Sequence, residues 1–301
     1  MAIRTAEGGA TRALCSRVVH TRMASAPQHE KTASEWRFDS VSDVTIPEAF
    51  ARDGFVCLSQ VLGSGILDEW LEWSYSHFSQ CFELLFQQGH TAFPTHRRNG
   101  IYAMSCGAKH GFREVVMRSP GRYELSLLQS PTPLLEPILN ILSPVIPQLL
   151  QESSFDRLQL CHVSLLMATP GATEQAWHAD GGHVSLSQHL PCHCLNVFIP
   201  LVDIPMNLGP TELRPGTHFH TRNLGPMMLL AKARKTLRSP VVPLLKAGDV
   251  LVFDYRVLHR GRANRDPELH RPILVLSFAK TWFVDVCNFP KRSMYEPCSD
   301  I

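Results

Sequence analysis

The segment that most constrains this chain is Trp177-His178-Ala179-Asp180-Gly181-Gly182-His183, where one residue separates an imidazole from a carboxylate. Side chains at i and i+2 of an extended chain point the same way, so His178 and Asp180 can face one point. A later segment, Gly248–His259, runs through an apolar stretch and ends on a third candidate, His259. Two imidazoles and one carboxylate form a facial triad suited to non-haem Fe(II), because coordination positions stay open. We therefore expect a fold that brings two strand ends, distant in sequence, to one metal.

A His-x-Asp pair alone is weak evidence, because the chain has 15 histidines and a hydrogen-bonded pair at a strand end is the simpler reading. Arg271 strengthens the interpretation of this pair as part of a metal site, since it immediately precedes the apolar run 272–278. If strands 250–258 and 272–278 are antiparallel neighbours, Arg271 returns near the level of His259. A guanidinium fork pairs bidentately with carboxylates. We predict that Arg271 binds the distal carboxylate of a 2-oxo dicarboxylate whose other end chelates the metal; a solvated arginine at a strand start is the alternative.

Several further motifs occur in a fixed order along the chain. They are Phe50-Ala51-Arg52-Asp53-Gly54-Phe55-Val56-Cys57-Leu58, His178-x-Asp180, Leu208-Gly209-Pro210 to Pro215-Gly216-Thr217-His218, and Ala247-Gly248-Asp249 to His259-Arg260-Gly261 with Asn264 and Arg271. In this order they resemble the phytanoyl-CoA dioxygenase family of Fe(II)/2-oxoglutarate-dependent oxygenases. The resemblance extends over residues 45–283.

The resemblance implies an activity and a set of site residues. Iron would be held by His178, Asp180 and His259, and 2-oxoglutarate by Arg271 with help from Asn196 and Ser277. The reaction would use O2 to hydroxylate a small organic or lipid-like substrate, with release of succinate and CO2. Two alternatives remain open: a jelly-roll protein that binds metal without turnover, and another cupin-type metalloenzyme that does not use 2-oxoglutarate.

The coarse pattern predicts a mainly β fold with flanking helices. Helices are expected at 46–53, 64–88 and within 131–150, and the tryptophans Trp70 and Trp73 at helical spacing are expected to be core residues. Strands are expected at 55–58, 158–167, 195–201, 211–214, 241–245, 250–255 and 273–278. Many short strands with turn signals after a helical start favour a double-stranded β-helix, or cupin-like jelly roll.

Composition bounds the protein class. With 301 residues and a 44% hydrophobic fraction, one domain with a sizeable core is expected over residues 41–301. The net charge of +2 gives no reason to expect nucleic acid, and no uninterrupted apolar run reaches membrane-spanning length. Nine scattered cysteines without a secretory signal predict reduced thiols in an intracellular protein. The group from His189 through Cys192 to Cys194 fits zinc spacing poorly.

Two segments of the sequence each allow two interpretations. Residues 1–40 hold Arg4, Arg12, Arg17 and Arg22 among small residues, which suits either a mitochondrial transit peptide or a disordered tail. The expected location is therefore cytoplasmic or mitochondrial. Residues 91–118 are polar and glycine-containing, and form either a substrate loop or a solvated connection. Within them, Tyr102, Lys109 and Arg113 are the candidate substrate contacts.

Overall fold

The computed structural model of the chain describes residues 35–87, 111–127, 132–284 and 289–296, and these described residues group into one compact unit. Residues 1–34 of the predicted tail and two candidate substrate residues, Tyr102 and Lys109, lie outside the described residues. Strand β1 (Arg37–Phe38) already pairs with the main sheet ahead of residue 41. The boundary at residue 41 stays a prediction.

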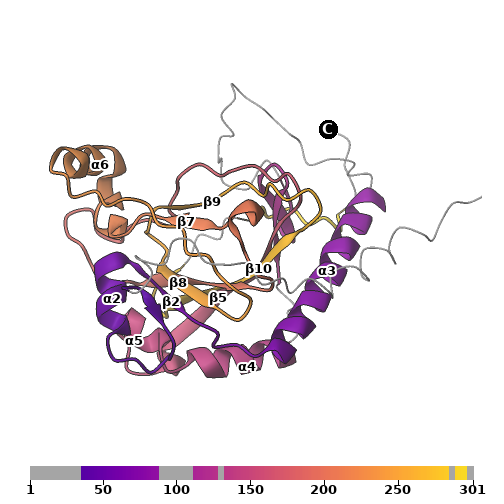
Figure 1. Cartoon of the computed structure of the whole chain (residues 1–301), viewed down its shortest axis with the longest axis horizontal. Helices are drawn as coiled ribbons and strands as arrows, with labels where there is room; N and C mark the ends of the chain where they lie inside the picture. Colours follow the sequence, from indigo (N-terminus) through magenta and orange to yellow (C-terminus); the bar gives the residue numbers. More distant parts are fainter. Residues whose placement is uncertain (1–34, 88–110, 128–131, 285–288, 297–301) are drawn as a thin grey trace, which may run out of the picture. The chain divides into compact units, whose positions relative to one another are not determined.

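Two sheets form the β framework. The large sheet contains, in spatial order, β1 (Arg37–Phe38), β2 (Phe55–Leu58), β8 (Val250–Asp254), β6 (Cys194–Pro200), β10 (Arg271–Lys280), β5 (Leu158–Ala168), β4 (Arg122–Ser126) and β3 (Val115–Ser119). Its pairs are antiparallel except for β1 with β2. The second sheet pairs β7 (Thr211–Leu213) with β9 (His259–Gly261). Figure 1 shows β7 and β9 on one side of the large sheet.

The predicted pairing of strands 250–258 and 272–278 is wrong. β6 lies between β8 and β10 and pairs with both of them. All seven residues of β6 are buried, so this strand satisfies its hydrogen bonds on two edges and takes a central position. The strand expected at 241–245 also reduces to one residue, because only Val241 pairs, with Leu213.

Helices cover the other side of the large sheet. They are α2 (Ile46–Asp53), α3 (Ser64–Gln87), α4 (Thr132–Leu142) and α5 (Ile146–Leu150). A further helix, α6 (Leu224–Ala233), follows β7 of the second sheet along the chain. Short 3-10 turns occur at 155–157, 206–208, 217–219 and 221–223. Figure 1 shows α2, α4 and α5 on the side away from β7 and β9. Trp70 is fully buried in this helical layer, as predicted, and its indole N–H donates to the Leu134 carbonyl. Trp73, also predicted as a core residue, is partly buried against the same core. None of the helices in the described ranges combines the length and apolar character that a membrane crossing requires.

Alternate side chains of β10 point to opposite faces of the large sheet, one face toward the hydrophobic core and the other toward the second sheet. Leu274, Leu276 and Phe278 join the core cluster that contains helix residues such as Ile138 and Leu142. The alternate residues, which include Arg271 and Ser277, point to the opposite face, toward the second sheet. The polar side chains on this inner face of the large sheet are therefore the candidates for a functional site.

Candidate metal centre

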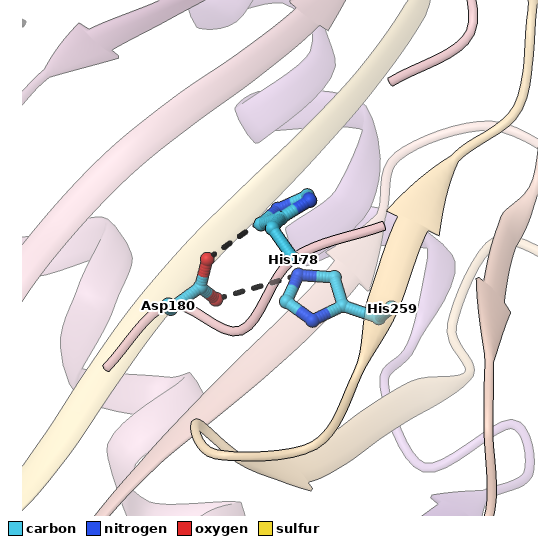
Figure 2. A group of neighbouring side chains, drawn as sticks. All are labelled: His178, Asp180 and His259. Atoms are coloured by element: carbon cyan, nitrogen blue, oxygen red, sulfur yellow. Dashed lines mark ion pairs between the residues drawn. The ribbon is translucent and has the colours of Figure 1, made fainter. Parts of the chain in front are cut away.

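His178, Asp180 and His259 meet as the His-x-Asp pattern predicts. One ligand atom from each residue lies within 4.8 Å of the others, and within the described part of the chain no other group of histidine, cysteine or acidic residues meets this condition. The Asp180 carboxylate stands between the two imidazoles: Oδ1 is 3.6 Å from His178 Nε2 and Oδ2 is 3.4 Å from His259 Nε2. Figure 2 shows the three side chains turned toward one another.

Backbone hydrogen bonds explain why residues so distant in sequence converge. His178 and His259 form an antiparallel bridge through two N–H···O bonds of 3.0 and 2.8 Å. The bridge extends the second sheet, because His259 begins β9. Asp180 is tied in turn by its own N–H, which donates to the Tyr255 carbonyl at 2.9 Å. The two ligand segments are thus held to each other directly.

The tautomer of each histidine suits metal binding. Nδ1 of His178 lies 2.8 Å from the Ala176 carbonyl, and Nδ1 of His259 lies 3.0 Å from the Val257 carbonyl. A carbonyl only accepts, so both Nδ1 atoms carry hydrogen, and Nε2 is the ring atom left to bind a metal. Burial, followed by the neighbouring His259, lowers the pKa of His178 to about 4. Two imidazole Nε2 atoms and one carboxylate form the donor set expected for Fe(II).

Arg271 lies at one end of the inner face together with a residue that the sequence reasoning missed, Arg122. Both are fully buried, and both strand positions pair with Ala168 from opposite sides. Arg271 donates to the Gly209 carbonyl, and Arg122 Nη2 donates to the Arg262 carbonyl at 2.7 Å. No carboxylate within the described ranges pairs with either guanidinium. Nε and Nη2 of Arg271, and Nε and Nη1 of Arg122, have no hydrogen-bond partner.

The electrostatics of this arginine pair are unfavourable without a ligand. Burial lowers the pKa of Arg122 to about 10. Burial, followed by the charge of Arg122, holds the pKa of Arg271 well below its usual value. Arg122 is also placed with respect to the triad, because a Cβ on Gly261 would meet its Nη1 at 2.7 Å. Gly261 is two residues along β9 from His259, so the guanidinium lies about 7 Å of strand away from a ligand position.

Asn196 and Ser277 lie on the same inner face. Asn196 Nδ2 donates to Asp180 Oδ2 at 2.6 Å, and Ser277 Oγ donates to Asn196 Oδ1 at 2.6 Å. Their predicted contact with 2-oxoglutarate stays a prediction, while the observed contacts join them to the metal ligand Asp180.

A second polar group on this face centres on Glu124. Its carboxylate accepts from Arg118 Nε at 2.5 Å and from Ser164 Oγ at 2.7 Å, and His162 Nε2 lies 3.4 Å away. Burial would raise the pKa of Glu124, but Arg118, His162 and Ser164 together hold it below its usual value. A signal existed in the sequence: Arg122 and Glu124 are two residues apart on one short strand and therefore share a face.

The remaining candidates lie apart from the triad's hydrogen bonds. Arg113 is half exposed and pairs with Glu114, and its substrate role stays a prediction. Cys192 is a buried free thiol, in line with the predicted reduced cysteines, and Cys194 is also buried. His218 Nε2 lies 3.1 Å from the Ala51 carbonyl, a structural contact to the end of α2.

Comparison with known proteins shows the family to which the chain belongs. A jelly roll with this triad at one end of its second sheet defines a class of non-haem iron oxygenases. The Phytanoyl-CoA dioxygenase (PhyH) family model matches residues 50–271, and the chain belongs to this family. The family predicted from the sequence is thereby confirmed, and the matched span includes the triad, Arg122 and Arg271.

A curated relative and several solved structures are similar. The chain is 34% identical over 111 residues to "Dioxygenase easH" of Epichloe festucae var. lolii; this match spans 36% of the chain and 55%, about half, of that relative's length. EctD from S. alaskensis, with bound Fe, has a TM-score of 0.54 at 16% identity, covering 86% of this chain and 82% of that one. AviO1 from Streptomyces viridochromogenes Tue57 gives 0.53 at 20% identity, covering 82% and 98%. The non-heme alpha ketoglutarate dependent epimerase SnoN from nogalamycin biosynthesis gives 0.52 at 17%, covering 78% and 81%. These likenesses confirm the predicted fold.

Proposed function

We propose that the protein is an Fe(II)- and 2-oxoglutarate-dependent dioxygenase that uses O2 to hydroxylate a small organic or lipid-like substrate, releasing succinate and CO2. The family membership supports the class of reaction. The observation that carries the cosubstrate assignment is the pair Arg122 and Arg271. Two buried cations with four unpartnered nitrogen atoms and no described acidic partner carry a large desolvation cost, which a bound dicarboxylate would offset.

The roles of the residues follow from their positions. His178, Asp180 and His259 would hold the iron, and Arg271 and Arg122 would bind the distal carboxylate of 2-oxoglutarate. Iron and 2-oxoglutarate together would supply the oxidising power for attack on a substrate C–H bond. Gly261 leaves room for the Arg122 guanidinium, since any side chain at that position would collide with it. Asp180 at the carboxylate position favours hydroxylation over halogenation, because related halogenases have a small residue there.

The first experiment is an anaerobic titration of Fe(II)-loaded protein with 2-oxoglutarate, followed by the weak visible metal-to-ligand charge-transfer band. We expect a band that is lost in His178→Ala and that needs more 2-oxoglutarate in Arg271→Leu. Iron that is demonstrably bound without any band would favour a metal-binding jelly roll without turnover, or a cupin-type enzyme with a different cosubstrate. An Arg271→Leu protein with unchanged 2-oxoglutarate affinity would refute the role of Arg271.

A further inference from the structure

Asp180 differs from the two histidines in what fixes its side chain. Its side chain is 31% exposed, against 14% for His178 and 4% for His259, so packing restrains it least. Each histidine ring is oriented by a backbone carbonyl two residues before it. For the Asp180 carboxylate, the described residues offer one hydrogen bond of this kind, from the side-chain amide of Asn196.

The direction of the Asn196 amide is determined by its neighbours on both sides. Ser277 Oγ lies 2.6 Å from Oδ1 and donates to it, and Nδ2 lies 2.6 Å from Asp180 Oδ2. If the amide were flipped, its carbonyl oxygen would face the carboxylate oxygen, and two acceptors would repel each other. The hydrogen bonds therefore run one way, from Ser277 through Asn196 to Asp180.

The register of the large sheet builds this arrangement. Ser277 of β10 is paired with Asn196 of β6, which is paired with Phe253 of β8. Paired residues share a face, so all three point toward the second sheet. The ring of Phe253 packs on the His259 ring with centroids 4.8 Å apart. One cross-strand row thus supports two of the three ligands, through a hydrogen bond on Asp180 and a ring contact on His259.

We propose that Asn196 is a positioning residue that orients the Asp180 carboxylate for metal binding, and that Ser277 acts through it. The inference rests on the proposed function only in requiring that the triad binds a divalent metal. The amide restrains rotation of the carboxylate before metal arrives, and a donor on Oδ2 disfavours chelation by both oxygens. Nδ2 carries a second hydrogen, so a contact with 2-oxoglutarate remains compatible with this role.

The test measures Mn(II) affinity without 2-oxoglutarate, using the electron paramagnetic resonance signal of free aqueous Mn(II). Asn196→Leu keeps the branching and the number of heavy atoms of the side chain and removes the donor, and we expect affinity to fall about 10- to 100-fold. Ser277→Ala should weaken binding to a smaller extent. In the double variant, the loss should equal that of Asn196→Leu alone, because the contribution of Ser277 passes through the amide.

The matched control is Ser164→Ala, a buried serine on the same face of β5 that donates to Glu124 and not to the triad. Its Mn(II) affinity should equal that of the wild type. Equal affinities in wild type and in a folded Asn196→Leu would overturn the positioning role. Should Asn196→Leu fail to fold, an unchanged Mn(II) affinity in Ser277→Ala would overturn the relay. A wild-type protein that binds no Mn(II) would instead overturn the metal site, and with it the proposed function.

Discussion

Arg122 and Arg271 both pair with Ala168, one from β4 and the other from β10, and their side chains converge on the same buried end of the inner face. Neither has a carboxylate partner among the described residues, although Arg256, Arg118 and Arg37 each pair with an acid. Buried charges are normally paired, so this arrangement indicates a site prepared for an anion.

The first prediction concerns this pair. Arg122→Met should weaken 2-oxoglutarate binding about 10- to 100-fold, the loss expected for a charge-assisted hydrogen bond in a buried site. Mn(II) affinity should not change, because Arg122 does not contact the triad. Removing an unpaired buried charge should also leave the ligand-free protein as stable as before or more stable. Urea unfolding with and without 2-oxoglutarate would measure the change in cosubstrate binding and the change in stability of the ligand-free protein.

A matched control for this prediction is Arg37→Met. Arg37 is partly buried and pairs with Asp249 at 2.9 Å, away from the inner face. It should lose stability, since Asp249 is left buried without its partner, and should keep 2-oxoglutarate affinity. The reverse pattern in the two variants would remove Arg122 from the cosubstrate site.

A second prediction concerns the ligands themselves. His178→Ala or Asp180→Ala should abolish binding of iron at the site and all turnover, because two remaining donors hold a divalent ion poorly. Calorimetric titration with Fe(II) under argon would measure this. Retention of wild-type affinity in either variant would show that the metal binds elsewhere.

A third prediction uses two adjacent glycines. A Cβ on Gly181 would lie 1.9 Å from the Tyr255 ring, whereas a Cβ on Gly182 would meet nothing within 4 Å. Gly181→Ala must therefore displace either the ring or the segment that carries Asp180, whose N–H also donates to Tyr255. We expect Gly181→Ala to reduce Mn(II) affinity clearly and Gly182→Ala to leave it unchanged. Equal affinities would mean that the ring moves aside without affecting Asp180.

The triad could be predicted from the sequence because it rests on a local pattern, one spacer between His178 and Asp180, with His259 at the end of an apolar strand. The elements Ile46–Asp53 and Phe55–Leu58 were predictable to the residue, since Gly54 adopts a positive φ of 82° that ends the helix. These features depend on a few neighbouring residues.

The neighbours of β10 could not be predicted in the same way. Which strand lies beside it is decided by β6, whose hydrophobic residues occur far from both β8 and β10 in the sequence. Arg122 was missed for a related reason. An arginine at the start of a short strand is usually solvated, and only the packing of β4 against β5 shows that this one is fully buried. Asn196 lies on the strand expected at 195–201, but its contact with Asp180 becomes visible only in three dimensions.

The last prediction concerns pH. Burial, followed by the charge of Arg256, lowers the pKa of His193 from 6.5 to about 4, and His183 and His189 shift in the same direction for the same leading causes. Between pH 6.5 and 4, the unfolded chain binds protons at these sites that the folded chain does not. The contribution of these three histidines to the free energy of unfolding is therefore fully present above pH 6.5, and it is lost as the pH falls toward 4.

His193→Phe should reduce this dependence by up to one proton, because the ring packing against Phe283 is kept while the titrating group is removed. Tyr255→Phe is the control: it removes the 3.3 Å hydrogen bond between Tyr255 and His193 Nε2 without removing the imidazole, so the slope should persist. Urea midpoints at pH 7.5, 6 and 5 with a chelator present would give the slopes. A slope in His193→Phe equal to that of the wild type would show that His193 already titrates normally in the folded protein.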